Sequence, residues 1–144
     1  MAKGIVSIKN SEGGGISPTP QTVYSNYSSS SGNPRSSNIV CNTTTTTISE
    51  TGKYVVSAWA CSAVGDHTAY NRGGTLELYV NNTSVKSVSA DKTGTTDVSF
   101  NRSMISDIID LHSGDTVYAK GSFGQNDDGP LYVSTGISII FMGY

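Results

Sequence analysis

The side chains that could do chemistry in this sequence are few and far apart. His67 follows Asp66, and His112 lies three residues before Asp115, each in a turn-like segment. Neither histidine stands beside a nucleophile signature of the Ser-His-Asp or Cys-His kind. The 11 acidic residues also single out no pair of carboxylates such as a glycosidase requires. The sequence therefore predicts a protein that is not an enzyme.

One acidic segment could bind a cation. Asn126, Asp127, Asp128 and Gly129 follow one another, and neighbouring carboxylates beside a glycine can wrap Ca²⁺. The interpretation that we adopt is a polar turn between two strands, which leaves calcium binding near Asp127 and Asp128 as an open alternative. Asp115 is interpreted in the same way, as a turn-stabilising side chain. No metal site and no cofactor is predicted.

Two polar loops are the predicted binding elements. In the first, Tyr70 and Arg72 offer an aromatic plane and guanidinium donors, a combination that suits a saccharide. Asp127 lies in the second loop, residues 124–130. We expect Tyr70, Arg72 and Asp127 to contact a sugar or protein receptor, because such loops lie at the ends of a sandwich. A solvated loop without a ligand is the alternative.

Charge and apolar patterning exclude several classes of partner. Nine basic against 11 acidic residues give a net charge of −2, so a general attraction to nucleic acid is not expected. No apolar stretch is long enough for a signal peptide or a membrane span, which predicts synthesis in a cytosol and no membrane insertion. Cys41 and Cys61 belong to no metal-binding pattern and are expected as free thiols, with a disulfide formed after release as the alternative.

The elements that must position these side chains are short strands. Only 14% of the 144 residues are charged and 16 are glycine, which is not a helical composition. Asn81 and Asn82 predict a tight hairpin, because Asn tolerates a positive φ. Residues 103–111 fit either a short strand or a helical turn. The remaining predicted strands are residues 4–8, 43–47, 54–61, 75–80, 84–90, 96–100, 116–123 and 131–144.

The chain is predicted to form one domain in two parts. Residues 17–38 are mostly Ser, Thr, Pro, Asn and Gly, and we expect a surface excursion or the arm of an assembly there. Residues 1–47 then comprise an N-terminal strand and this excursion, and residues 48–144 form the body of the same domain. Eight to ten strands separated by turns predict an antiparallel β-sandwich or jelly roll.

The strand at residues 54–61 is apolar on both faces. Tyr54 and Val56 alternate with Val55 and Trp59, so each face needs its own cover. The C-terminal residues 137–142 are equally apolar and should lie inside a sheet or against a partner. In a small antiparallel domain the second cover is often another subunit.

The chain from about residue 48 onward resembles the jelly roll shared by tumour necrosis factor and the globular head of complement component one-q. The resemblance lies in a strand entry where Tyr54 follows Gly52, a hairpin with Asn82 where Gly is usual, a turn at Gly114 and Asp115, and a closing apolar strand. It implies a homotrimer packed around an axis through the inner sheets. The expected interface residues are Tyr54, Val55, Trp59, Ile137, Ile139 and Phe141.

The departures from that family point to a particular context. There is no collagen-like Gly-X-Y run and no signal peptide. The chain looks more like the small trimeric structural proteins of bacteriophages: capsid decoration, head-fibre and tail-tip or receptor-binding proteins. The resemblance implies a virion protein whose partners are its own copies, other virion proteins and a host-surface glycan or protein. A bacterial cell-surface or carbohydrate-binding module of the same fold is the alternative.

Overall fold

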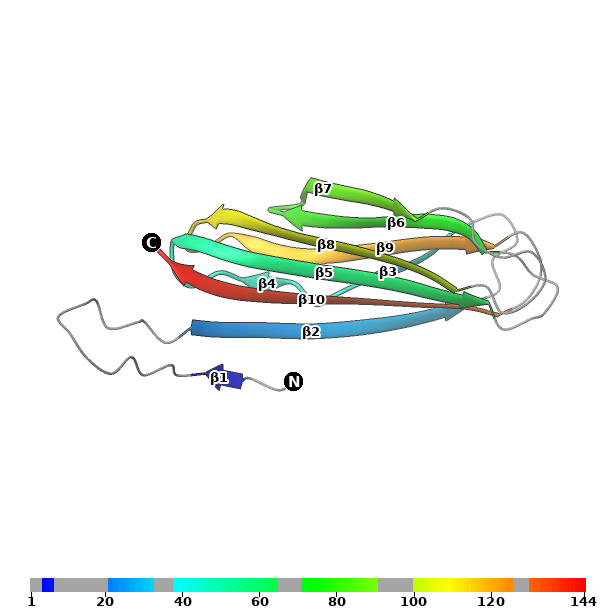
Figure 1. Ribbon diagram of the computed structural model, residues 1–144, viewed down its shortest axis with the longest axis horizontal. Helices are drawn as coiled ribbons and strands as arrows, with labels where there is room; N and C mark the ends of the chain where they lie inside the picture. The colour runs from blue at the N-terminus through cyan, green and yellow to red at the C-terminus, as the bar shows by residue number, and fades with distance from the viewer. Residues whose placement is uncertain (1–3, 7–20, 33–37, 65–70, 91–99, 126–129) are drawn as a thin grey trace.

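The computed structural model is a sandwich of two antiparallel sheets (Figure 1). It describes residues 4–6, 21–32, 38–64, 71–90, 100–125 and 130–144. Ten strands lie in this described part, within the predicted range of eight to ten, and the predicted all-β jelly-roll sandwich is confirmed. The same part contains no helix that is long and apolar enough to cross a membrane.

Each sheet contains five strands. Sheet A has the order β1-β2-β10-β5-β8, and sheet B has the order β3-β9-β6-β7 with β4 also paired to β9. The strands of sheet A are β1 (Gly4–Val6), β2 (Gln21–Gly32), β10 (Leu131–Gly143), β5 (Gly52–Val64) and β8 (Phe100–Leu111). Those of sheet B are β3 (Ile39–Asn42), β4 (Thr46–Thr47), β9 (Thr116–Gln125), β6 (Asn71–Val80) and β7 (Thr83–Ala90).

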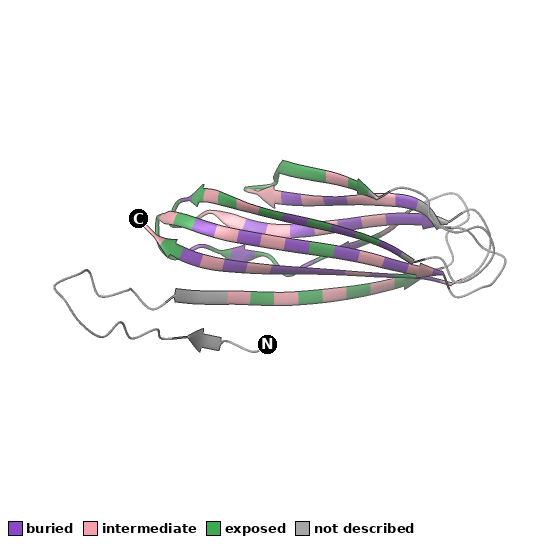
Figure 2. Ribbon diagram, in the orientation of Figure 1, coloured by how far each residue is buried: buried purple, intermediate pink, exposed green. Residues whose placement is uncertain are grey.

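The core lies between the sheets and follows from the alternation of apolar residues along each strand. In β5, Val56, Ala58 and Ala60 are fully or almost fully buried, while the residues between them face outward. Leu76 and Phe123 answer them from sheet B. Figure 2 shows the resulting bands of buried and exposed residues along the strands. Full burial of one such side chain contributes about 1.5–3 kcal/mol, so this layer is the main source of stability.

The predicted hairpin at Asn81 and Asn82 is confirmed. Both residues have positive φ, 49° and 63°, as a two-residue turn of the primed type requires. The Asn81 side chain also ties the hairpin to the next turn, since its Nδ2 donates to Asp115 Oδ1 at 2.7 Å and its Oδ1 accepts from the Thr116 N–H at 2.9 Å. The hydrogen bond from Asn81, followed by that from the His112 N–H, lowers the pKa of Asp115. The turn-stabilising role predicted for Asp115 is therefore confirmed.

Three local predictions need correction. The segment expected as an excursion contains β2, which pairs with β10 over ten residues from Val23 to Gly32. The helical alternative for residues 103–111 is wrong, because β8 is a continuous strand paired with β5. The strand expected at residues 43–47 is wrong at 43–45, since only β4 pairs there. Residues 96–99 lie outside the described residues.

Two buried threonines differ in one respect that governs stability. Thr43 Oγ1 accepts a hydrogen bond from the buried Ala119 N–H at 2.9 Å, whereas Thr135 Oγ1 has no partner within the described residues. We therefore expect Thr43→Val to lower the free energy of unfolding by about 1–3 kcal/mol, because it orphans a buried donor. The same change at Thr135 should be neutral or stabilising. Urea unfolding of both variants tests this, and equal destabilisation would contradict it.

Candidate functional site

The face of sheet A turned away from sheet B, called here the outer face, holds most of the large apolar side chains that the protein exposes. Nine such side chains are exposed in the described part of the chain, and six of them lie on this face. They come from four neighbouring strands, so they are contiguous across the sheet. The six are Tyr27, Trp59, Met104, Ile108, Tyr132 and Met142.

The strand register orders the outer face into rows. A row of serines crosses all four strands, and two of its hydroxyls, those of Ser57 and Ser106, are 2.9 Å apart. Apolar rows flank it on both sides. The serine row is Ser25, Ser138, Ser57 and Ser106. One flanking row is Ile140, Val55 and Ile108, and the other is Tyr27, Gly136, Trp59 and Met104.

Trp59 lies at the centre of the second apolar row, directly over Gly136. A Cβ atom at position 136 would come 2.4 Å from Nε1 of the indole, so only glycine leaves room for the ring at this position. The indole is therefore seated against the sheet, with 37% of Trp59 still exposed. Met104, its neighbour on β8, is 68% exposed. The centre of the outer face is thus a flat apolar surface.

Charged side chains lie away from that centre. Lys53 Nζ and Asp110 Oδ1 form an ion pair of 2.8 Å in the next row beyond Val55 and Ile108. Lys86 Nζ lies 2.7 Å from Asp107 Oδ2 and joins β7 of sheet B to β8 of sheet A. The hydrogen bond from Lys86 lowers the pKa of Asp107. Exposed pairs of this kind add little stability, so their main effect is to set the charge pattern around the apolar rows.

The outer face of sheet B has a different character. Tyr79 and Tyr118 stack with ring centroids 4.8 Å apart and planes 5° from parallel. Lys120 Nζ lies 5.7 Å from the Tyr79 centroid and 3.5 Å from Glu77 Oε2, which also accepts from the Tyr79 hydroxyl at 3.2 Å. These groups satisfy one another within the sheet. This face therefore suits contact with water better than the outer face of sheet A does.

The six predicted interface residues divide between two faces. Val55 and Trp59 lie on the outer face of sheet A. The side chains of the other four are buried inside their own chain, where the rings of Tyr54 and Phe141 lie 5.1 Å apart, so they support the sheet instead of reaching a neighbour. The four are Tyr54, Ile137, Ile139 and Phe141. The trimer contact itself stays a prediction.

Sequence reasoning missed three exposed members of the outer face: Tyr27, Met104 and Ile108. Tyr27 was in a segment with no expected strand, and the other two were in the segment left open between strand and helix. The alternation of Met104, Ser106 and Ile108 with Ile105 and Ile109 was the available signal for a two-sided strand.

The other predicted sites fall largely on residues that the structure does not describe. Tyr70, Asp127, Asp128 and His67 lie outside the described residues. Arg72 lies near the start of β6. No group of three His, Cys, Asp or Glu side chains that could hold a metal ion occurs among the residues that the structure describes.

The two cysteines lie on different sheets and are not bonded to each other. Cys41 is buried on β3, and Cys61 is half-buried on the outer face of sheet A. His112 Nδ1 lies 3.8 Å from Asp115 Oδ2 in an exposed turn, where the Asp115 carboxylate already holds backbone and Asn81 donors. That arrangement is structural.

No model of a known protein family matches the chain, and no curated protein matches it in sequence. Solved structures do share its fold. The structure of the Gx strain of infectious bursal disease virus superposes with a TM-score of 0.52 and 12% identity over 99% of this chain. The VP2 subviral particle of that virus gives a TM-score of 0.50 and 12% identity over 94% of this chain. This chain spans 38% of the length of each viral chain.

The globular domain of the zebrafish complement 1qA protein is a more distant likeness. It has a TM-score of 0.44 and 16% identity over 79% of this chain and 94% of its own length. That similarity is too low to bear on function. The viral structures, at 12% identity, share the fold alone. The chain is an all-β protein of two antiparallel sheets with a jelly-roll-like sandwich fold.

Proposed function

We propose that this protein is a non-enzymatic structural component of a bacteriophage particle, and that it assembles as a homotrimer through the outer face of sheet A. The observation that carries the proposal is the contiguous set of exposed apolar side chains on that face. An apolar patch of this kind on an otherwise polar protein marks an interaction surface.

The composition of the outer face supports a contact between proteins. Trp59 and Met104 occupy its centre, and the charged residues Lys53, Asp110 and Arg102 lie in the rows beyond. An apolar, aromatic centre with a charged rim is the usual anatomy of a protein interface. The serine row adds hydroxyl groups that can pair with one another when water is excluded. A second copy of the same chain is the occupant that we propose, as the sequence resemblance to trimeric jelly rolls implies.

A place in a virus particle is supported by the fold and by the composition. The viral structures that share the fold include a VP2 subviral particle. The polar composition, with 14% charged residues, suits a rigid protein that presents polar loops at its surface. Capsid decoration, a head fibre and a tail tip are the positions that we propose. A cell-surface or carbohydrate-binding module is the alternative.

The receptor contact is proposed for the loops at the far end of the sandwich from the C-terminus. Arg72 lies near the start of β6, at that end of the molecule (Figure 1). We propose that Arg72 acts with Tyr70 and Asp127 on a host-surface glycan or protein. Three copies in a trimer would present three such sites, so weak single contacts would combine through avidity.

We expect the purified protein to have a mass near three times 15.1 kDa by light scattering. Met104→Asp should give a monomer, because a charge buried in a dry contact costs several kcal/mol in each copy. Trp59, the only tryptophan, should then emit at longer wavelength as it becomes exposed to water. Val40→Asp is the matched control, since Val40 is an exposed apolar residue on sheet B. A trimeric Met104→Asp protein, or a monomeric native protein, would overturn the contact.

We expect the triple variant Tyr70→Ala, Arg72→Ala, Asp127→Ala to lose attachment to host cells or glycans while its mass and melting temperature stay near those of the native protein. The reason is that the change removes ring, guanidinium and carboxylate contacts without touching the core. Surface plasmon resonance on immobilised cell-wall glycans measures the effect. Full attachment by the triple variant would remove these loops from the proposal and leave a decoration role.

Mass spectrometry of purified virions separates the two candidate functions. The protein should be present in stoichiometric amounts in the particles, and it should rebind to particles stripped of it, because its proposed partners are virion proteins. Saturable glycan binding with no association with virions would instead support the cell-surface module.

A further inference from the structure

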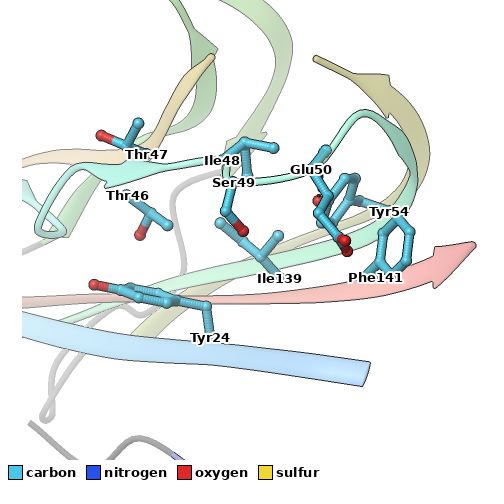
Figure 3. A pocket seen from close by; sticks show the side chains of 9 residues that line it. All are labelled: Tyr24, Thr46, Thr47, Ile48, Ser49, Glu50, Tyr54, Ile139 and Phe141. Carbon is cyan, nitrogen blue, oxygen red and sulfur yellow. Dashed lines mark hydrogen bonds between the residues drawn. The ribbon is translucent and has the colours of Figure 1, made fainter. Parts of the chain in front are cut away.

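A hollow opens between the sheets at the end of the sandwich where β5 begins and β10 ends (Figure 3). It encloses about 350 Å³ of empty space, part of it open to solvent. This is within the size range of small-molecule sites, about 300–1,000 Å³. The lining residues are Tyr24, Thr46, Thr47, Ile48, Ser49, Glu50, Tyr54, Ile139 and Phe141.

One wall of the hollow, residues 46–50, is fixed by hydrogen bonds to the turn between β8 and β9. The Ile48 N–H donates to the Asp115 carbonyl and the Gly114 N–H to the Ile48 carbonyl, each at 2.8 Å. Ser113 Oγ donates to the Ser49 carbonyl at 3.0 Å. These contacts hold the wall without any ligand, so the hollow is preformed and binding would cost little ordering entropy.

The floor of the hollow is apolar, and one side is aromatic. Ile139 and Phe141 rise from β10 and are almost fully buried. The Tyr54 hydroxyl donates to the Glu50 carbonyl at 2.7 Å and closes the inner end. Burial, and then the charge of Glu50, raises the pKa of Tyr54, which keeps this phenol protonated as a donor. The half-exposed Tyr24 ring, on β2, bounds the opposite side (Figure 3).

The polar groups of the hollow are mainly hydroxyls. Thr47 and Ser49 are exposed at its rim. Thr46 is buried, its Oγ1 has no partner within the described part of the chain, and Figure 3 shows this oxygen on the side of Tyr24. Glu50 is the one charged residue among those that line the hollow. A single carboxylate without a cation disfavours phosphate, sulfate and carboxylate ligands.

We propose that this hollow binds one pyranose ring of a neutral saccharide. A pyranose has an apolar C–H face, which would lie on the Tyr24 ring and Ile139, and a rim of hydroxyls, which would donate to Glu50 and pair with Ser49 and Thr46. The arrangement matches a site with an apolar floor and a few convergent polar groups. It goes beyond the proposed function, because the site belongs to one chain and uses none of the residues on the outer face.

Titration of the full-length protein with methyl β-D-galactoside, methyl β-D-glucoside and N-acetylglucosamine tests the proposal by NMR. At least one sugar should shift the amide signals of Ser49 and Glu50 in a saturable way. Choline chloride and sodium phosphate are the comparison probes for a cation and an anion. Shifts with choline alone, or no saturable shift with any of the three sugars, would overturn the proposal.

Two tyrosines on β2 provide a matched pair of variants. Tyr24 lines the hollow, whereas Tyr27 is exposed on the outer face, on the other side of the same strand. Tyr24→Ala should weaken sugar binding at least tenfold and Tyr27→Ala should leave it unchanged. Thr46→Val removes the unpartnered hydroxyl at no cost to the fold and should weaken binding severalfold. Unchanged affinity in both the Tyr24 and Thr46 variants would overturn the site, whatever the oligomeric state.

Discussion

The pairing of β10 with β5 is the constraint on which the rest of the structure depends. The two strands are in continuous register from Leu131 opposite Val64 to Phe141 opposite Tyr54. Successive side chains of a strand point to opposite faces, so a slip of one residue would send the core set of either strand to the outer face. The register therefore fixes, in one step, which apolar residues fill the core and which remain exposed. Both strands are apolar on both faces, which makes this choice consequential.

The sequence was sufficient to predict what depends on local chemistry. The all-β class, the Asn81-Asn82 turn, the role of Asp115 and the two faces of β5 all follow from residue types and their spacing. The predicted interface depended on pairing and was less successful. Alternation separates Ile137, Ile139 and Phe141 from Ile140 and Met142, but only the partner strand decides which set meets the core. That information lies in residues 70 to 90 positions away along the chain.

The strand β2 was missed for a related reason. From Ser25 to Gly32 it has Tyr27 as its single large apolar side chain, so it carries almost no hydrophobic signal. Its backbone hydrogen bonds to β10 hold it in place, and Ser is tolerated there because β2 contributes little to the core. The ambiguity of residues 103–111 was resolved in the same way. Ile105 and Ile109 turn toward the core because β5 pairs with β8, and a helical stripe would have left the β5 edge unpaired.

This division of labour explains how one thin sandwich can present two separate surfaces. The centre of sheet A uses its inner residues for the core and its outer residues for an apolar face. At the end near the C-terminus, β2 lies across the sheet from the wall formed by residues 46–50, which is tied to the turn at Asp115. That tie keeps the two layers apart where no large side chain fills the gap beside Tyr24. A change on the outer face leaves the tie intact, since none of its donors or acceptors comes from that face. Assembly and ligand binding can therefore vary independently in this fold.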